Sequence, residues 1–596
     1  MRATTKRLSP PLFLACLLAF VANAADKPVA GPDDADPRNW TSYGRVATES
    51  HFSPLTEINR DTVSRLRLAW TLDLDVTSVN STPLAVDGVL YVAAGYSIVS
   101  AVDGRTGKLL WRYDPGVAAI AGRKLRSGAG IRGLAYSNGR LFVGTHDGRL
   151  IALDARKGGV VWGVEVLNKG DFTFISGAPR VFNDRVVIGF GDSHAEFGAI
   201  EVYSAVDGKF LWRWQTDGGG GTIWNAITVD EVNNRFYIGT GNARGDIENS
   251  LACSVVAIMA PSGKQLWQYD QAPGDRASCD SSADITLATL DIEGQRRRVL
   301  LHAPRDGNVH VIDADSGVAL SSKRSGEGTH NHFAQSFSPR TGWLYLPTTQ
   351  LPATLDADTP ASEGKSYLLA WDPAKQRAQW AIPTPGAYSG GVLTTAGDLV
   401  FQGQADGYFM AYSASGGRKA WAFYAASPPL AAPISYGVGN KQYIAVLAGP
   451  PSGQAASLGA ISGQFGWDSR MHPRRLLAFT LDGTAELPPT PSPSVAKPVD
   501  VPEFSINDTL VAEGTRLYAR CQWCHGAGAI AGGGAPDLRA SATPMNPPAF
   551  AAAVRGGNEA RGMPRFAELA DRELDALRHY LRARARAASG AARPDK

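Results

Sequence analysis

Apolar strands and tight turns alternate between about residues 60 and 485, and one phrase recurs along this stretch. In each copy an apolar strand ends in a small residue and Asp, a Gly-Lys-like turn follows, and a second strand ends in Trp. The clearest copies lead to Trp111, Trp162 and Trp212, and further copies occupy 262–267, 312–317, 370–380 and 411–421. The first three tryptophans are about 50 residues apart, which leaves room for one four-stranded sheet per repeat. This period predicts a β-propeller.

A strand with period-2 alternation precedes the copies, as at 88–92 and 140–144. The seven copies and a last one at 476–483 predict eight blades. We expect the strand from Arg67 to Trp70 to pair with the last strands and close the ring, because closure removes exposed sheet edges. We expect the repeat tryptophans to pack between blades, since stacked sheets need a large aromatic residue in each.

The composition changes after Leu487. Residues 488–493 read Pro-Pro-Thr-Pro-Ser-Pro and begin a stretch typical of a semi-rigid extended linker. Beyond it, Leu574, Leu577 and Leu581 recur at helical spacing with arginines opposite. We therefore divide the chain into a signal peptide (1–24), an all-β eight-bladed propeller (25–487), a proline-rich linker (488–505) and a small all-α domain (506–590).

The small domain contains Cys521-Gln522-Trp523-Cys524-His525, the C-x-x-C-H spacing at which haem c is attached. The two thiols form thioethers with the haem, and the histidine is the first axial ligand of the iron. A zinc half-site or a disulfide would use the same cysteines. Zinc needs a second ligand pair, however, and no cysteine follows Cys524. The domain is therefore interpreted as a cytochrome c.

The second axial ligand of the haem has three candidates in this domain. Met563 is preferred, because a Gly-Met-Pro loop exposes its thioether on an extended segment. Met545 is the alternative, and His579 is expected on a helix surface. A His/Met pair raises the haem potential and suits electron acceptance.

The N-terminus has the pattern of a secretory signal. Basic residues at 2, 6 and 7 precede an apolar run from 12 to 21, and Ala22-Asn23-Ala24 forms a cleavage site. This run is too short to span a bilayer, and no stretch of about 18 apolar residues occurs later, so we expect a periplasmic protein without a transmembrane segment. Cys16 makes a lipoprotein signal the alternative.

Charge and cysteine content narrow the function further. The formal net charge is +3 with 19% charged residues and no long basic run, which excludes a polybasic nucleic-acid binder. Outside the signal and the haem motif only Cys253 and Cys279 remain. They either pair in an oxidising compartment or stay as buried thiols.

Several phrases of the propeller segment are specific in combination. They include Phe52-Ser53-Pro54-Leu55, Ser81-Thr82-Pro83-Leu84-Ala85-Val86-Asp87-Gly88, Gly219-Gly220-Gly221-Thr222-Ile223-Trp224, Tyr237-Ile238-Gly239-Thr240-Gly241-Asn242 and His302-Ala303-Pro304-Arg305-Asp306-Gly307. With them the chain resembles the quinohaemoprotein alcohol dehydrogenases over nearly its whole mature length. In that family an eight-bladed propeller holds pyrroloquinoline quinone (PQQ) and a metal ion, and a cytochrome c domain follows.

By this resemblance the quinone lies in the central funnel of the propeller. Trp224 is its floor, Arg132 binds a quinone carboxylate, and Ser176 stands where the family has Thr. Arg305 falls where a cation contacts the reactive carbonyls, and a cation there stabilises negative charge that develops on the quinone oxygens.

The resemblance also implies a metal ion beside the quinone, either Ca²⁺ or a lanthanide. Glu196 and Asn242 are its expected ligands, since both offer the hard oxygen atoms that calcium prefers. Asp280 coincides with the extra carboxylate with which lanthanide-dependent relatives bind their more highly charged ion. A solvated loop residue is the alternative for Asp280.

Four positions depart from the family pattern. Asn80 replaces a Glu that touches the quinone, Arg126-Ser127 replaces a vicinal Cys-Cys, and Tyr388-Ser389 replaces Trp-Asn. Ser278 stands at the catalytic Asp, and a serine cannot accept the substrate proton at neutral pH without a base of its own. We therefore expect Asp280 to take this proton or to bind the metal.

The leading hypothesis is a periplasmic enzyme that oxidises an alcohol with PQQ, with Asp280 as the base, Arg305 at the quinone and hydride passing to the quinone. Electrons then pass singly through the haem to a soluble acceptor such as a cytochrome c or a cupredoxin. One alternative is a degenerate propeller that has lost quinone chemistry and docks a partner for the cytochrome. A third hypothesis keeps the enzyme and assigns it a bulky alcohol or polyol.

Overall fold

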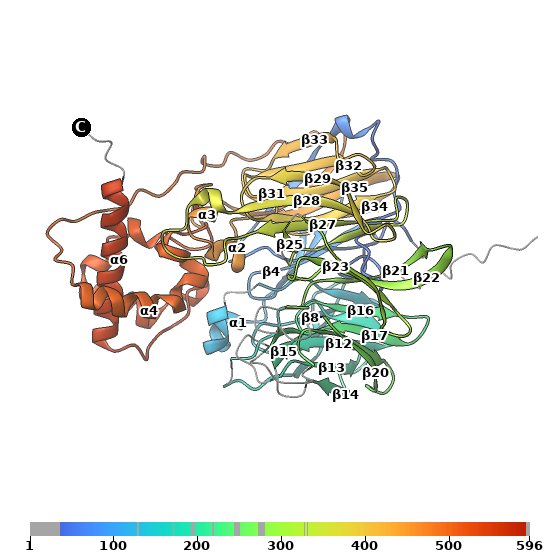
Figure 1. Cartoon of the computed structure of the whole chain (residues 1–596), viewed down its shortest axis with the longest axis horizontal. Helices are drawn as coiled ribbons and strands as arrows, with labels where there is room; N and C mark the ends of the chain where they lie inside the picture. Colours follow the sequence, from blue (N-terminus) through green and yellow to red (C-terminus); the bar gives the residue numbers. More distant parts are fainter. Residues whose placement is uncertain are drawn as a thin grey trace, which may run out of the picture.

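The computed structural model describes residues 36–127, 130–170, 172–191, 197–216, 220–243, 251–271, 280–326, 328–330 and 332–591. The predicted signal peptide lies outside these residues. Figure 1 shows a β-propeller, coloured from blue to light orange, with a helical domain in deeper orange and red beside it. Within the described residues no helix is both long and apolar enough to cross a membrane.

Eight four-stranded antiparallel sheets form the blades, as predicted. Blades 1 to 4 are β3 (Leu84–Val86), β4 (Val89–Ala94), β5 (Ile98–Asp103), β6 (Leu109–Tyr113); β7 (Ala135–Ser137), β8 (Arg140–Gly144), β9 (Arg149–Asp154), β10 (Val160–Glu165); β11 (Arg180–Phe182), β12 (Arg185–Phe190), β13 (Ala199–Ser204), β14 (Phe210–Gln215); and β16 (Ile227–Asp230), β17 (Arg235–Gly239), β19 (Ser254–Met259), β20 (Gln265–Asp270). Blades 5 to 8 are β21 (Ile285–Ile292), β22 (Gln295–His302), β23 (Asn308–Asp313), β24 (Ala319–Arg324); β26 (Ser336–Ser338), β27 (Trp343–Gln350), β28 (Lys365–Asp372), β29 (Arg377–Thr384); β30 (Ser389–Thr395), β31 (Leu399–Gln404), β32 (Tyr408–Ser413), β33 (Lys419–Tyr424); and β34 (Ile434–Val438), β35 (Lys441–Ala448), β36 (Arg474–Leu481) with β2 (Leu66–Leu74). Short strands add to this ring: β1 (Phe52–Ser53) joins blade 7, β25 (Thr329–His330) joins blade 6, and β15 (Gly220–Thr222) pairs with β18 (Gly241–Ala243).

The ring closes through the N-terminal strand β2, which pairs with β36 as the outer strand of blade 8. The register places Leu68 opposite Phe479 and Trp70 opposite Ala478. This pairing confirms the predicted closure and leaves blade 8 built from both ends of the propeller segment.

Each repeat tryptophan joins its own blade to the next one. The indole N–H of Trp162 donates to the carbonyl of Ala205 at 3.2 Å, and the ring lies against Gly208 in the β13–β14 turn. Gly208 has φ 75°, and a Cβ there would lie 2.8 Å from the ring, so backbone and packing both require glycine. The same contact recurs in Trp70 with Gly107, Trp111 with Gly158, Trp212 with Gly263, Trp267 with Gly317 and Trp380 with Gly417. The expected packing of the repeat tryptophans between blades is confirmed.

The segment from Trp40 to Ser53 contacts the first strands of seven blades. Trp40 pairs with Ala85 of blade 1. The chain then bonds through its carbonyls to backbone N–H groups of Tyr136, Val229, Leu287, Phe337 and Thr394, and through the Glu49 carboxylate to Arg180 of blade 3. The Glu49–Arg180 ion pair has 2% exposure on both side chains. This segment therefore ties the blades together from inside the ring.

The C-terminal domain is helical, with α4 (Asp508–His525), α5 (Pro547–Gly556) and α6 (Asp571–Ala591). Helices α4 and α6 cross at Gly514, where a Cβ would lie 2.2 Å from the carbonyl oxygen of Ala576. The predicted leucine stripe of α6 is buried in the core of this domain. The arginines are less external than expected, because Arg582 is 3% exposed and donates to the carbonyls of Val499, Leu538 and Ser541.

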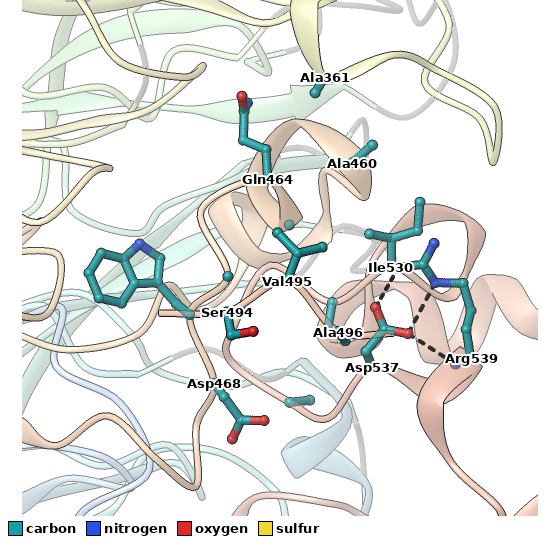
Figure 2. Close-up of a pocket in the computed structure, with 15 residues that line it drawn as sticks. Ala361, Ala460, Gln464, Asp468, Ser494, Val495, Ala496, Ile530, Asp537 and Arg539 are labelled. Carbon is teal, nitrogen blue, oxygen red and sulfur yellow. Dashed lines mark hydrogen bonds and ion pairs between the residues drawn. The ribbon is translucent and has the colours of Figure 1, made fainter. Parts of the chain in front are cut away.

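Glycine residues of the propeller and of the helical domain allow close packing at the junction between the two domains. The propeller loop with α2 (Gln454–Ser457) and α3 (Ala460–Gly463) faces the loop 526–534 of the helical domain. A Cβ at Gly459 would lie 2.7 Å from the carbonyl oxygen of Ala527, so the two backbones are in contact there. Residues 488–505 contain no helix or strand and bond to both domains, for example from Ser494 N–H to Gly466. A cavity of about 260 Å³ remains there, between Gln464, the linker at 494–496 and the Asp537–Arg539 ion pair (Figure 2).

Candidate functional site

The funnel residues come from loops of several blades and converge on His332, between β25 and β26. The Nη1 of Arg132 donates to the carbonyl of His332 at 2.8 Å, and the rings of His332 and Trp224 lie 6.1 Å apart. The Nε2 of His332 is 3.6 Å from the Oδ2 of Asp280. Arg305 is close enough for its charge to act on both Asp280 and His332. The predicted site residues thus lie together around His332, which the sequence analysis did not predict. They are Arg132, Trp224, Asp280 and Arg305.

Asp280 precedes β21 and is 3% exposed. Burial alone would raise the pKa of its carboxyl, but His332, the Ser282 donors and Arg305 together hold the pKa below its ordinary value. The Oδ1 accepts hydrogen bonds from the Ser282 backbone N–H at 2.9 Å and from the Ser282 hydroxyl. The second oxygen faces His332. Asp280 is therefore a buried carboxylate in the funnel and not a solvated loop residue.

Burial lowers the pKa of the His332 imidazole to about 3. The Asp280 carboxylate opposes this shift, whereas Arg305 and Arg132 add to it, so the ring is neutral at neutral pH. Its backbone has φ 67°, an uncommon conformation for a residue with a side chain. Such strain often marks a functional position. No motif spacing links residues 280 and 332, so only the folded structure reveals this neighbour.

Trp224, the predicted floor of the quinone site, is held by close backbone packing. A Cβ on Gly177 would lie 1.6 Å from the Trp224 carbonyl oxygen, so the 175–178 segment and Trp224 touch. The carbonyl of Ser176 accepts from the Arg132 backbone N–H at 2.9 Å. Asn225 donates from Nδ2 to Oδ1 of Asp284 at 2.8 Å, which fixes the chain directly after Trp224. The Trp224 indole N–H is buried without a hydrogen-bond partner in the described part of the chain.

Of the proposed metal ligands, Glu196 lies outside the described residues, and so does the side chain of Asn242. The described residues next to Glu196, Asn242 and Asp280 contact one another. Phe197, which follows Glu196, forms a β-bridge with Gly220 of β15, and β15 pairs with β18. Gly241 of β18 packs on the Asp280 carboxylate and on Thr222. Described residues alone contain no group of three His, Cys, Asp or Glu side chains suited to a metal. The backbone arrangement is compatible with a shared oxygen site.

The departing positions are partly described. Ser278 and the side chains of Arg126 and Ser127 lie outside the described residues. Asn80 donates from Nδ2 to the Ser452 hydroxyl at 2.7 Å, beside the domain junction. Tyr388 is 5% exposed with its ring 6.3 Å from that of Phe333, and burial raises the pKa of its hydroxyl.

Cys253 is disulfide-bonded, while Cys279 lies outside the described residues. The alternative of a buried free thiol is therefore wrong for Cys253. A disulfide here is typical of an oxidising compartment.

The haem motif lies at the C-terminal end of α4. Cys521 and Cys524 are not in disulfides, and burial raises the pKa of their thiols to about 12 and about 11. The Nδ1 of His525 lies 2.8 Å from the carbonyl oxygen of Pro536, which orients the ring and leaves Nε2 for a metal.

The three candidates for the second axial position differ in location. His579 was expected on the helix surface, but its side chain is only 12% exposed, and its Nδ1 accepts from the Asn507 backbone N–H at 3.1 Å. Asn507 caps the start of α4, and a rise of 1.5 Å per residue places it roughly 27 Å along the helix from His525. The Met545 turn packs on α6, where Arg578 bonds the Pro544 carbonyl. Met563 is half-buried beside Gly562, which touches the propeller at Tyr96.

Comparison with known proteins assigns both domains. The propeller matches the family described as "Glucose/ethanol/alcohol dehydrogenase, beta-propeller domain" over residues 40–322 and 367–444, and residues 509–581 match "Cytochrome C oxidase, cbb3-type, subunit III". Quinohemoprotein alcohol dehydrogenase ADH IIB of Pseudomonas putida is 35% identical over 97% of this chain and 98% of the relative. The solved structure of ADHIIG from the same species superimposes with a TM-score of 0.85 at 32% identity, covering 92% of this chain and 96% of that one. The quinohemoprotein alcohol dehydrogenase of Comamonas testosteroni gives 0.84 at 30% identity, covering 94% and 96%.

Proposed function

The chain belongs to the quinohaemoprotein alcohol dehydrogenases, and from this premise we propose how its own residues oxidise an alcohol and pass the electrons on. The protein is a PQQ-dependent alcohol dehydrogenase whose electrons leave through haem c in its C-terminal domain. The observation that carries the residue assignment is the convergence of Arg132, Trp224, Asp280 and Arg305 around His332.

The residues of the funnel fit a planar, anionic quinone. Trp224 offers a flat indole with an unpaired, buried N–H, and Arg132 and Arg305 supply two cations near it. Bound PQQ supplies a two-electron acceptor for the substrate. We assign Trp224, Arg132, Ser176 and Arg305 to hold it. A cation beside an oxygen that becomes negative in the reaction acts through electrostatic stabilisation.

Asp280 is the group we assign to the substrate proton. Its carboxylate is ionised, buried and fixed by Ser282, so one oxygen remains for the substrate hydroxyl or for a metal. Glu196 and Asn242 complete the proposed site for Ca²⁺ or a lanthanide, which would polarise the quinone oxygen. A europium-containing methanol dehydrogenase is among the similar solved structures, at 25% identity and a TM-score of 0.66 over 75% of this chain.

Haem c would be held by Cys521 and Cys524 through thioethers, and His525 and Met563 would bind its iron. The orientation of His525 by Pro536 and the position of Met563 at the propeller side support this set. The acceptor is proposed to be a small soluble electron carrier, such as a cytochrome c or cupredoxin. A periplasmic location is proposed from the secretory signal and from the haem c motif.

Reconstitution tests this function. The haem-loaded protein is incubated with PQQ and either Ca²⁺ or a lanthanide, and a panel of alcohols is added. We expect the quinone absorbance to appear and the haem to become reduced with at least one alcohol. If PQQ does not bind and the haem stays oxidised with every alcohol, the degenerate-propeller alternative is correct.

A further inference from the structure

One propeller residue, Tyr96, reaches the haem side of the C-terminal domain. It lies between β4 and β5 of blade 1 and is 8% exposed. Its ring packs with Val117, Ala121 and Leu125, which are 1–2% exposed, in a small core under α1 (Val117–Ile120). In Figure 1, α1 is the blue helix of the propeller that lies toward the C-terminal domain.

Two groups of the haem site border Tyr96. Its hydroxyl donates to the carbonyl oxygen of Gly562 at 3.3 Å, in the residue before Met563. The Cys524 side chain lies within electrostatic range of the Tyr96 hydroxyl. Tyr96 therefore borders both Cys524 and the residue that precedes the proposed ligand Met563, on the side of the haem site that faces blade 1.

The segment that carries Met563 is itself compact. The N–H and carbonyl of Met563 both pair with Asn558, at 2.9 and 2.8 Å, across the short turn η8 (Glu559–Arg561). Gly562 has φ 89°, and a Cβ there would lie 3.5 Å from the Tyr96 hydroxyl and 3.6 Å from Thr77. Helix α1 lies against η8. The hairpin 558–563 is thus a rigid unit with the propeller packed on one side.

We propose that Tyr96 is a positioning residue for the haem, which holds the Met563 hairpin in place and excludes water from the haem edge near Cys524. The potential of a haem depends on its axial ligands and on its burial, so a propeller residue with these contacts sets the potential of the neighbouring domain. The 3.3 Å hydrogen bond is long for a hydroxyl donor. We therefore expect the buried ring to contribute more than the hydroxyl. This inference rests on the proposed ligation by Met563.

Two Tyr96 variants distinguish the contribution of the ring from that of the hydroxyl group. In the haem-loaded full chain, Tyr96→Phe is expected to lower the midpoint potential slightly, and Tyr96→Ala is expected to lower it clearly and to speed binding of imidazole to the iron several-fold. The matched control is Tyr345→Phe, which also removes a buried tyrosine hydroxyl bonded to a carbonyl, that of Ala414 at 3.0 Å, between blades 6 and 7. The control is expected to leave both quantities unchanged.

Optical spectroscopy of Met563→Ala tests separately whether Met563 is the second iron ligand, on which the proposed role of Tyr96 depends. Loss of the methionine–iron charge-transfer band in Met563→Ala supports the ligation, and persistence of the band overturns it together with the role of Tyr96. If Met563→Ala loses the band while Tyr96→Phe and Tyr96→Ala keep the wild-type potential and imidazole rate, Tyr96 has no positioning role. An equal loss of potential in Tyr345→Phe also overturns the proposal, because the effect would then be general loosening.

Discussion

The carboxylate of Asp280 lies 3.6 Å from the imidazole of His332, although the two residues belong to loops of different blades. Asp280 precedes the first strand of blade 5, and His332 precedes the first strand of blade 6. By the family resemblance, Ser278 stands at the usual catalytic Asp. The blade 5–blade 6 boundary supplies a buried carboxylate and a neutral imidazole that we propose to act in its place.

Asp280→Asn is expected to lower alcohol-dependent haem reduction by about 100-fold or more, because a positioned general base contributes 10²–10⁴-fold. Asp291→Asn, the same substitution at an exposed position of β21, is the matched control and should retain wild-type activity. Stopped-flow measurement of haem reduction checks both. Excess Ca²⁺ or lanthanide distinguishes the two roles of Asp280, since metal would restore turnover only if Asp280 acts solely as a ligand. Full activity in Asp280→Asn without added metal rules out both roles.

Much of this site could be predicted from local phrases, because residues such as Arg132 and Trp224 sit in short segments with their own recognisable pattern. The place of His332 in this site could not be predicted from the sequence, since its contact with Asp280 depends on the neighbouring blade and on a backbone with φ 67°. The eight blades followed from a repeated strand-and-turn pattern that needs no distant information. The path of 40–53 and the glycine contacts at the domain junction involve pairs far apart in the chain, for which the sequence contains no local signal.

Because each repeat tryptophan packs on a turn glycine of the next blade, we expect an alanine substitution at such a glycine to destabilise the protein more than one at a turn glycine without this contact. Gly208→Ala forces a Cβ to 2.8 Å from the Trp162 ring, whereas Gly139→Ala meets nothing within 4 Å at the same φ of 75°. Both substitutions carry the left-handed backbone cost of roughly 1–2 kcal/mol, and overpacking adds about 1–3 kcal/mol to Gly208→Ala alone. Thermal unfolding should show a clearly lower Tm for Gly208→Ala. Equal Tm values would show that the ring moves aside freely.

The Glu49–Arg180 pair is expected to be sensitive to the loss of one partner. Both side chains are 2% exposed, so Glu49→Ala leaves the Arg180 guanidinium buried without its carboxylate. Breaking such a pair costs about 3–5 kcal/mol. Replacing both residues by apolar ones, as in Glu49→Leu with Arg180→Met, should be less destabilising than the single change. The test is denaturant unfolding of the two single variants and the double variant. If the losses in unfolding free energy of the single variants add up to that of the double variant, the two groups act independently.

Acidification is expected to destabilise the propeller through buried histidines. Burial lowers the pKa of His51 and of His146 to about 4, against an unfolded value near 6.5. The unfolded chain therefore binds more protons below pH 6.5. The stability from these residues is present above pH 6.5 and falls toward pH 4, by roughly 2 kcal/mol per histidine at pH 5. Tm measured from pH 7.5 to 5 should drop, and His146→Gln should make the slope shallower. A Tm that stays constant over this range contradicts the assignment.

The strand β2 has a consequence for the order in which the molecule is made. It is among the first segments to leave the ribosome, yet its partner β36 ends only at Leu481. The innermost segment 40–53 must likewise await seven blades that do not yet exist. Contacts of such separation slow folding. A chain interrupted before Arg474 would therefore lack more than one strand of its last blade: the ring would stay open, and β2 would be left without a partner.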